Sequence, residues 1–449
     1  MRDIALALIF VPMLLGSMRF LHTATMVWVW TALAMPASFM YGPLSALPLN
    51  KIAVGSSLIA LFVDKTKRKF AADPTFVFHT LFVVQGLISF SFGLTDIPRT
   101  YDLIDRIVKV WALCCFMRVA NRERLQLHAM VMMLTICVGL HGILEGMKYI
   151  LSAGSHKVSV VGFFGDNNSM AMAVLTVLPF FHYFWKYSSR GIVRLGFAGL
   201  GVLALAGVVA SASRGAVIGL VVLAGMMVLQ SQRKILGLMV AAGLGIALAV
   251  AVPGTWLDRM NTIQAAETDG SFMGRVSSWK MNTIVALNRP LTGGGFSALE
   301  DARVHRDYVG QFGMLDFIPT PPPAGVVAAH SIYFEVLGDT GFIGFFLFIG
   351  MLAAWYTSVR QVKRMTRASK EKRWAYDLAV AIERSLAVYL VSGAALSAAY
   401  FENIYIEMTL AALLCVYIKE TYAPQGAKAP YLEYQAAQAP TAYAVRRSP

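Results

Sequence analysis

Residues 195–230, LGFAGLGVLALAGVVASASRGAVIGLVVLAGMMVLQ, decide the class of fold. Two long apolar runs, which we place at 193–210 and 214–231, flank a short stretch of small polar residues, and Arg214 is the one charged residue of the quoted sequence. A helix that crosses a bilayer needs roughly 20 mostly apolar residues. The stretch therefore predicts two transmembrane helices joined by a tight loop that carries an arginine.

The same pattern recurs along the whole chain. Of its 449 residues 57% are hydrophobic and only 14% are charged, whereas about 25% of the residues of a typical soluble domain are charged. We therefore predict an all-α polytopic integral membrane protein with about 12 transmembrane helices. Whether residues 4–20 cross fully is left open, because Pro12 interrupts this segment and Arg19 ends it. The predicted segments are 4–20, 24–40, 51–64, 75–95, 103–119, 124–151, 166–187, 193–210, 214–231, 233–252, 332–358, 383–400 and 404–418.

Basic residues cluster in five loops, and each cluster is separated from the next by two predicted segments. All five loops therefore lie on one side of the membrane, which the positive-inside rule identifies as the cytoplasm. These loops account for the net charge of +14, so that charge does not indicate nucleic-acid binding. The clusters are 65–69, 118–124, 186–194, 233–234 and 360–373.

This topology divides the chain into four parts. Residues 1–252 hold the first group of transmembrane helices, residues 253–331 form a long non-cytoplasmic loop, and residues 332–420 hold the last helices. Residues 421–449 are rich in Ala, Pro, Gln and Tyr and are expected to be a disordered cytoplasmic tail. No cleavable signal peptide is expected, because the first apolar run is not followed by a convincing small-residue cleavage site.

The loop at 253–331 is the most distinctive part of the sequence, because it carries most of the charge expected on the non-cytoplasmic side. A helix is predicted at 271–287 and ends at Asn288-Arg289-Pro290. Three glycines at 293–295 and a stiff, proline-rich stretch at 319–323 follow. Long loops with structure of their own are usually functional. We therefore expect the working part of the protein in this loop, which ends near His330.

Arg214 lies between two strongly apolar segments, where burying an arginine at mid-membrane costs about 2.5–3.5 kcal/mol. An arginine is tolerated there when it faces a polar cavity or an interface. The neighbouring Ser211, Ala212 and Ser213 are small, and they leave backbone N–H groups and hydroxyls open to an anion. The alternative is a loop arginine that extends to the interface and has no function.

Arg275, Trp279 and Asn282 lie on one face of the helix predicted at 271–287, because they are spaced by about one and two helical turns. Arg275, next to the aromatic side chain of Trp279, would be a second group that binds a phosphate. The alternative is an amphipathic helix whose polar face is only solvated.

Other chemistry has less support. The glycines at 293–295 lack the downstream Lys-Ser/Thr of a phosphate-binding loop, so a turn that allows close backbone approach is the better interpretation. Asp301, Asp307 and Asp316 are scattered and no His/Cys cluster has ligand spacing, so neither a metal site nor a cofactor is predicted. The cysteines lie inside apolar segments and are expected to pack in the core. They are Cys114, Cys115, Cys137 and Cys415.

His330 marks the entry to the segment at 332–358, on the side opposite to the basic loops. An imidazole has an ordinary pKa near 6.5, and a helix N-terminus would lower it and keep the ring neutral, as a general base requires. The alternative is an interfacial histidine without a catalytic role. Its place on the same side of the membrane as Arg214 and Arg275 favours catalysis.

Together these residues resemble the O-antigen ligase and polymerase superfamily, over roughly residues 160–420. The stretch from Ala329 to Glu335, with Phe401-Glu402-Asn403, is most similar to a branch of O-glycosylation ligases associated with exosortase systems. Many ligases carry Asn where this chain has Ser331. The resemblance rests on Ser213-Arg214-Gly215, Gly274-Arg275 with Trp279, Pro290-Leu291-Thr292-Gly293-Gly294-Gly295, and His330-Ser331-Ile332-Tyr333 with Gly338 and Gly341.

The resemblance implies a metal-independent glycosyltransferase with a GT-C-like fold in the bacterial inner membrane, with the loop at 253–331 catalytic and facing the periplasm. Its donor would be a glycan on undecaprenyl pyrophosphate, and its acceptor a hydroxyl of a lipid A-core sugar or of another glycan. By the same resemblance, His330 would activate the acceptor hydroxyl, and Arg214 and Arg275 would hold the pyrophosphate. Ser213, Trp279 and Tyr333 would line the substrate cavity, and direct displacement would invert the anomeric centre.

Three other functions stay open. A polysaccharide polymerase would use the same donor with a second lipid-linked glycan as acceptor, and a protein O-oligosaccharyltransferase would use a protein. A transporter or flippase is the alternative outside this chemistry, but we see no repeat between the two halves, and the polar residues concentrate in one loop. The identity of the glycan, the acceptor and the oligomeric state are not determined by the sequence.

Overall fold

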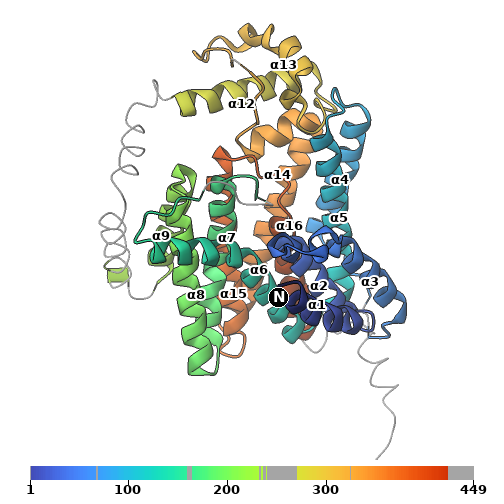
Figure 1. Ribbon diagram of the computed structural model, residues 1–449, viewed down its shortest axis with the longest axis vertical. Coiled ribbons are helices and arrows are strands. Elements are labelled where there is room, and N and C mark those ends of the chain that lie inside the picture. Colours follow the sequence, from blue (N-terminus) through green and yellow to red (C-terminus); the bar gives the residue numbers. More distant parts are fainter. Residues whose placement is uncertain are drawn as a thin grey trace, which may run out of the picture.

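The computed structural model describes residues 2–66, 69–158, 164–231, 270–323 and 325–422, with positions 234, 235 and 239. Within these residues it contains fourteen α-helices, several short 3₁₀ helices and no strand (Figure 1). Five of the described helices are long and apolar enough to cross a membrane. The predicted fold class is thus confirmed at this level: the protein is an all-α, multi-pass membrane protein.

Apart from α2, the first nine helices follow the predicted apolar segments, and α6 matches its segment at both ends. Aspartates begin two of them: a side-chain oxygen of Asp73 accepts the N–H of Phe76 in α4, and Asp166 accepts the N–H groups of Asn168 and Ser169 in α7. The bounds are α1 Arg2–Ser17, α2 Leu21–Leu33, α3 Leu49–Val63, α4 Pro74–Ser91, α5 Pro98–Ala120, α6 Arg124–Leu151, α7 Asn167–Tyr187, α8 Gly191–Ala210 and α9 Arg214–Gln230.

The first two helices are short. α1 has 16 residues and α2 has 13, which at about 1.5 Å per residue is less than the roughly 30 Å of a bilayer core. The segment predicted at 24–40 is divided: α2 ends at Leu33, and Pro36 opens a short 3₁₀ helix. Proline lacks an N–H and clashes with the preceding helical turn, so it stops the helix here. The segment predicted at 233–252 and the predicted tail fall largely outside the described residues.

The last three helices are α14 Ile332–Thr366, α15 Arg373–Ser392 and α16 Glu402–Thr421. α15 differs from the segment predicted at 383–400, because it begins in residues that looked like a charged loop. Arg373 pairs with Asp377 at 3.2 Å, and Glu383 pairs with Lys363 at 2.6 Å. Pairing lowers the free-energy cost of having these charges in the helix. The helix therefore begins before the apolar segment from which it was predicted.

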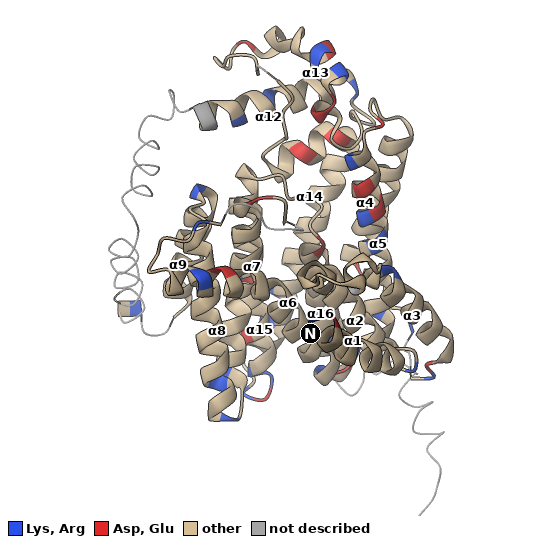
Figure 2. Ribbon diagram, viewed as in Figure 1, with Lys and Arg blue, Asp and Glu red and all other residues tan. Residues whose placement is uncertain are grey.

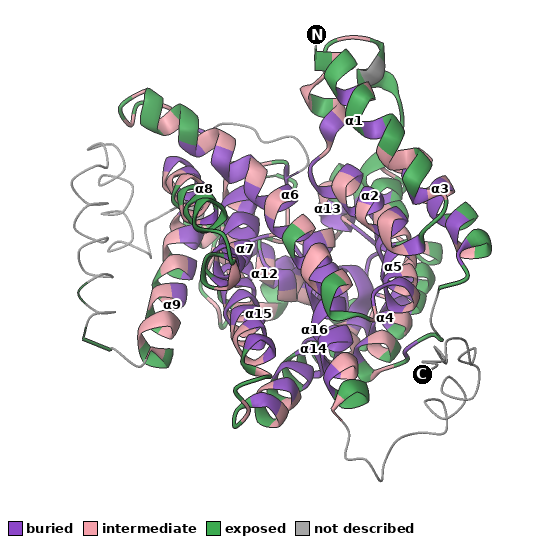
Figure 3. Ribbon diagram, turned by 90° about the horizontal axis from the view of Figure 1, so that it is seen from below, coloured by how far each residue is buried: buried purple, intermediate pink, exposed green. Residues whose placement is uncertain are grey.

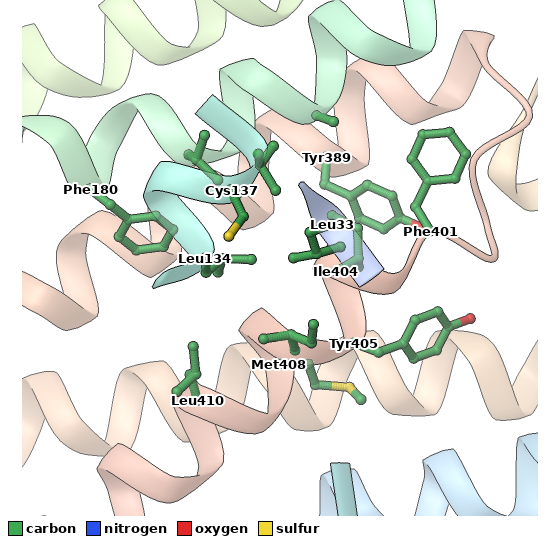
Figure 4. Packing of buried hydrophobic residues seen from close by; sticks show 14 of the residues in the cluster. Leu33, Leu134, Cys137, Phe180, Tyr389, Phe401, Ile404, Tyr405, Met408 and Leu410 are labelled. Atoms are coloured by element: carbon green, nitrogen blue, oxygen red, sulfur yellow. The ribbon is translucent and has the colours of Figure 1, made fainter. Parts of the chain in front are cut away.

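α16 forms the centre of the bundle. Its residues between Asn403 and Cys415 are buried on every face (Figure 3). Figure 4 shows side chains of α2, α6, α7 and α15 in the same buried cluster as those of α16. The expectation for the cysteines is confirmed: all four are unpaired thiols within helices, and Cys114, Cys137 and Cys415 are buried.

α14 is broken at Gly341, whose φ of 68° and ψ of −170° are not helical. The break frees backbone groups on both sides of it. The carbonyls of Gly338 and Asp339 accept the N–H groups of Gly294 and Gly295, at 2.8 and 3.0 Å. The first three turns of α14 therefore depend on a partner that is distant in sequence.

That partner is the glycine turn at residues 293–295, and the interpretation as a close-approach turn is confirmed. Gly293 has a φ of +64°, and a Cβ added to it would lie 2.6 Å from backbone atoms of α14. Gln85 of α4 also donates from Nε2 to the carbonyls of Leu291 and Thr340, at 2.6 and 3.1 Å. Hydrogen bonds therefore hold the glycine turn against α14 and α4.

Residues 270–323 and 325–331 form a cap at one end of the molecule (Figure 1). The helix predicted at 271–287 is confirmed as α12, Gly270–Asn288, and α13 spans Ala302–Val309. α12 packs against α14, and its Met281, Ile284 and Val285 are fully buried. Figure 2 shows Lys and Arg at the end of α8 that is remote from the cap.

Candidate active site

His330 is held at the junction between the cap and α14. It ends an irregular stretch, and the next residue, Ser331, caps α14 by accepting the N–H of Tyr333 at 3.3 Å. The backbone N–H of His330 donates to Ser397 Oγ at 2.7 Å, and its carbonyl accepts the indole N–H of Trp279 at 3.3 Å. Its position therefore depends on three separate parts of the chain.

The environment of the imidazole favours its neutral form. Partial burial lowers the pKa of His330 below its ordinary value, the positive charge of Arg275 lowers it further, and Asp166 opposes them in part. The direction is the one expected from the sequence, and burial and Arg275 are causes that the sequence did not indicate. Arg275 of α12 and Asp166 of the α7 N-terminus are therefore close enough to His330 to act on its charge.

Arg214 is the first residue of α9 and is partly buried. Its neighbours are more constrained than the sequence indicated. Ser213 Oγ accepts the N–H of Ala216 at 3.2 Å, and Ser211 Oγ donates to the carbonyl of Val208 at 2.6 Å. The expectation of hydroxyls left open around the guanidinium is thus wrong for Ser211, whose proton is used inside the turn, and Ser213 serves as the helix cap.

Two polar contacts attach the Arg214 turn to the elements around His330. Asn167 Nδ2 donates to the carbonyl of Ser211 at 2.6 Å, and Asn167 follows directly after Asp166, which acts on His330. Ser392 Oγ, at the end of α15, donates to the carbonyl of Gly215 at 3.2 Å, and the connection that carries Ser397 follows this residue. The Arg214 turn thus contacts the α7 N-terminus and the end of α15, while His330 contacts the connection that follows α15 and is acted on by the charge of Asp166. Arg275 joins them from the cap.

The predicted cavity residues also have structural contacts. Trp279 stacks on Phe334 with ring centroids 5.3 Å apart and an angle of 9° between the planes. Tyr333 donates its hydroxyl to the carbonyl of Leu390 at 3.0 Å and ties α14 to α15. Their contact with a substrate stays a prediction. Asn282, expected on the face of Arg275, is buried instead with its Oδ1 against Gly338 of α14.

Sequence reasoning missed three residues of this region. Asp166 could have been noticed as an aspartate at the start of an apolar segment, which is a capping signal. Glu335 belongs to the quoted motif but had no role; its Oε2 accepts the N–H of Ala399 at 2.9 Å. No sequence pattern pointed to Ser397, because its contact with His330 joins residues that are 67 positions apart.

The acidic residues of the cap have other partners. Asp301 accepts from Arg303 at 2.9 Å and from Thr95 at 2.8 Å, and these bonds lower the pKa of Asp301 to about 2. Asp316 pairs with the buried Lys280 at 3.3 Å. Within the described ranges, no group of three or more His, Cys, Asp or Glu residues is placed to hold a metal ion.

The arrangement can bind an anion and accept a proton. Arg214 lies at a helix N-terminus, where the backbone dipoles add partial positive charge. Arg275 supplies a second guanidinium, and both groups can form bidentate hydrogen bonds to phosphate oxygens. The neutral imidazole of His330, on which Arg275 acts, is suited to general-base work.

Comparison with known proteins agrees with this chemistry. No curated protein matches the chain. Residues 1–189 match a family of unknown function, DUF5935. Residues 199–349, which include Arg214, Arg275 and His330, match the model described as O-antigen ligase. The chain is therefore a multi-pass membrane protein with an O-antigen ligase domain at residues 199–349, which indicates a glycan-transferring enzyme of the ligase or polymerase kind that acts on lipid-linked glycans.

Proposed function

We propose that the protein is an O-antigen ligase-type glycosyltransferase, which moves a glycan from undecaprenyl pyrophosphate to the hydroxyl of a lipid A-core sugar. The supporting observation is that three residues of the matched domain share neighbours: the Arg214 turn contacts the α7 N-terminus and the end of α15, His330 contacts the connection that follows α15, and Arg275 and the α7 cap Asp166 act on the charge of His330. None of the three positions is close to the others in sequence. That they share neighbours is therefore a property of the fold, and it supports one shared site.

The two arginines act on the leaving group. The acceptor oxygen forms a bond to the anomeric carbon, the bond from that carbon to the phosphate oxygen breaks, and the electron pair leaves with the diphosphate. Negative charge grows on the diphosphate in the transition state, and the guanidinium groups of Arg214 and Arg275 stabilise it. Attack from the face opposite the leaving group inverts the anomeric centre.

His330 takes the proton of the acceptor hydroxyl. Only the neutral imidazole can do so, and burial together with Arg275 lowers the pKa of His330 and favours that form. General-base catalysis contributes about 10²–10⁴-fold to a rate. The arginines and the base supply the chemistry from side chains alone, so the proposed reaction is metal-independent.

The fold suits a lipid-linked donor. The site lies where the cap joins the helical bundle, so the isoprenoid can stay in the bilayer while the charged headgroup enters the polar region. The positive-inside rule supports a cytoplasmic position for the basic loops at the opposite end of the bundle, and hence a periplasmic position for the cap and the site at a bacterial inner membrane. A membrane bundle with a catalytic periplasmic cap corresponds to a GT-C-like enzyme.

The polymerase alternative shares donor, site and membrane side, and differs only in its acceptor. The matched family includes both functions. Offering lipid A-core and lipid-linked glycan acceptors in competition decides between them, and a protein acceptor in the same mixture tests the O-oligosaccharyltransferase.

The central experiment is glycan transfer by the purified protein in detergent, with no membrane gradient, which a transporter would not perform. Arg214→Lys and Arg275→Lys keep the positive charge but lose the planar guanidinium, which can donate two parallel hydrogen bonds to a phosphate. We expect each to lower turnover by about 10²-fold. His330→Ala should lower it by about 10²–10⁴-fold while donor binding persists. EDTA should have no effect.

Arg303→Lys is the matched control, because this exposed arginine pairs with Asp96 and Asp301 away from the site. Wild-type turnover by His330→Ala, or loss of activity in EDTA that a divalent ion restores, would refute the mechanism.

A further inference from the structure

His330 has a left-handed backbone conformation, with a φ of +48°. L-residues with a side chain rarely adopt this conformation, because Cβ approaches the following carbonyl oxygen. Such strained positions persist only when the surrounding structure imposes them, and they gather at functional sites. The groups that hold His330 in place therefore matter as much as its imidazole.

Both backbone polar groups of His330 are bound by side chains. Ser397 Oγ accepts its N–H at 2.7 Å, and the indole N–H of Trp279 donates to its carbonyl at 3.3 Å. The two partners come from different elements, the α15-to-α16 connection and α12. We call this pair of contacts the clamp.

The segment that carries Ser397 is held in place by hydrogen bonds to neighbouring helices. The adjoining residues 398–400 bind α14 and α16: Ala399 donates its N–H to Glu335 Oε2 at 2.9 Å and accepts from the Tyr405 hydroxyl at 2.8 Å. The Tyr400 hydroxyl donates to Asp339 Oδ2, also at 2.9 Å. Because Glu335 and Asp339 belong to the first turns of α14, the helix that follows His330 also anchors the residue that binds it.

Trp279 is fixed as well. Its ring stacks nearly parallel on Phe334, and α12 packs against α14. Arg275 lies one helical turn before Trp279 on α12 and acts on the charge of His330. Trp279 thus connects the backbone of His330 to the helix that carries Arg275.

We propose that Ser397 and Trp279 are positioning residues, which hold His330 in its left-handed conformation and so set the imidazole relative to Arg275. The inference rests on the proposed function for its catalytic consequence. Neither residue needs to touch the substrate, and both act through the backbone of His330.

Each of two substitutions removes one of the two hydrogen bonds of the clamp. Ser397→Ala deletes the acceptor, and Trp279→Phe deletes the indole donor but keeps a ring to stack on Phe334. Misplacement of a catalytic group by about 1 Å can cost 10²-fold, so we expect kcat to fall about tenfold to 10²-fold. The KM for the lipid-linked donor should not change, because the arginines are untouched. Ser397→Thr, which keeps the hydroxyl, should recover most of kcat.

The chain offers matched controls. Ser358 of α14 donates its hydroxyl to its own helix at 2.9 Å, and the Trp111 indole donates to Thr80 at 3.0 Å in another part of the bundle. Ser358→Ala and Trp111→Phe should leave kcat unchanged. Wild-type kcat in Ser397→Ala and Trp279→Phe would overturn the proposal, and so would an equal loss in the controls or no recovery in Ser397→Thr.

A second measurement does not depend on activity. Glycine adopts a positive φ without strain and alanine does not, so His330→Gly should unfold at a higher temperature in detergent than His330→Ala. A lower or equal midpoint for His330→Gly would contradict the left-handed conformation. If the wild type transfers no glycan at all, the proposed function fails, and the clamp is then tested by stability alone: Ser397→Ala should lower the unfolding temperature more than Ser358→Ala, and an equal loss in the two variants would contradict the clamp.

Discussion

At the scale of single residues, the charge of His330 depends on its burial and on two charged groups from different helices. Arg275 favours the neutral imidazole and Asp166 favours the protonated one, while burial adds to the effect of Arg275. A cation that helps to bind the diphosphate therefore also keeps the base unprotonated. The pH dependence of the rate therefore reports how strongly the charge of Arg275 acts on the base His330.

The rate of the wild-type enzyme should rise with pH and reach half its maximum below the ordinary imidazole value of about 6.5, because the pKa of His330 is lowered. Arg275→Gln removes a charge that lowers this pKa. The pKa of His330 then rises, and the ascending limb of the residual activity should move to higher pH.

The measurement is turnover at saturating donor between about pH 5 and 8. Arg303→Gln is the control, since Arg303 is exposed and pairs with Asp96 and Asp301. An ascending limb that stays in place in Arg275→Gln would show that the two groups are not coupled.

At the scale of elements, the break in α14 and the glycine turn form one unit. The turn donates to the carbonyls that Gly341 leaves unpaired, and Phe342 in return donates to the carbonyl of Pro290 at 2.9 Å. Any side chain at Gly293 would collide with the backbone of α14. The unit fixes the cap against the helix that begins beside His330.

Gly293→Ala should therefore destabilise the protein by about 1–3 kcal/mol from backbone strain, with the collision adding to this cost. Gly196→Ala in α8 is the matched control, because a Cβ there meets nothing within 4 Å. Thermal unfolding in detergent measures the difference. Equal midpoints for the two variants would mean that the glycine turn does not pack on α14 as closely as described.

At the scale of the whole molecule, α14 connects the two ends of the bundle. It has 35 residues, which at about 1.5 Å per residue is longer than a bilayer core of roughly 30 Å. If α14 crosses the membrane, as we propose, the cap at its start and the basic loop after its end lie on opposite sides of it. The positive-inside rule assigns the basic loop to the cytoplasm.

Single cysteines test this orientation in a background that lacks the four native ones. Gly325→Cys and Glu300→Cys lie in the cap and should react from the periplasm with an impermeant thiol reagent. Arg367→Cys, directly after α14, should react only once the membrane is opened. Labelling of Arg367→Cys in intact cells would reverse the topology and remove the site from the periplasm.

Local chemistry explains how much of the fold the sequence could predict. Apolar length alone placed most of the described helices, and Asn288-Arg289-Pro290 ended α12 where proline required it. The prediction was wrong where charges are neutralised by pairing, as at the start of α15, and where Pro36 divides an apolar run. Hydropathy averages over such pairs and breaks and does not detect them.

The sequence by itself determined that this is a helical membrane protein, and it marked Arg214, Arg275 and His330, because polar residues between apolar segments are costly unless they have a role. Only the tertiary structure decided what surrounds them. The contact of Ser397 with His330 joins residues 67 apart, and that of Trp279 joins residues 51 apart. Local periodicity cannot specify such contacts, since they exist only after the helices have packed and brought a side chain of one element to the backbone of another.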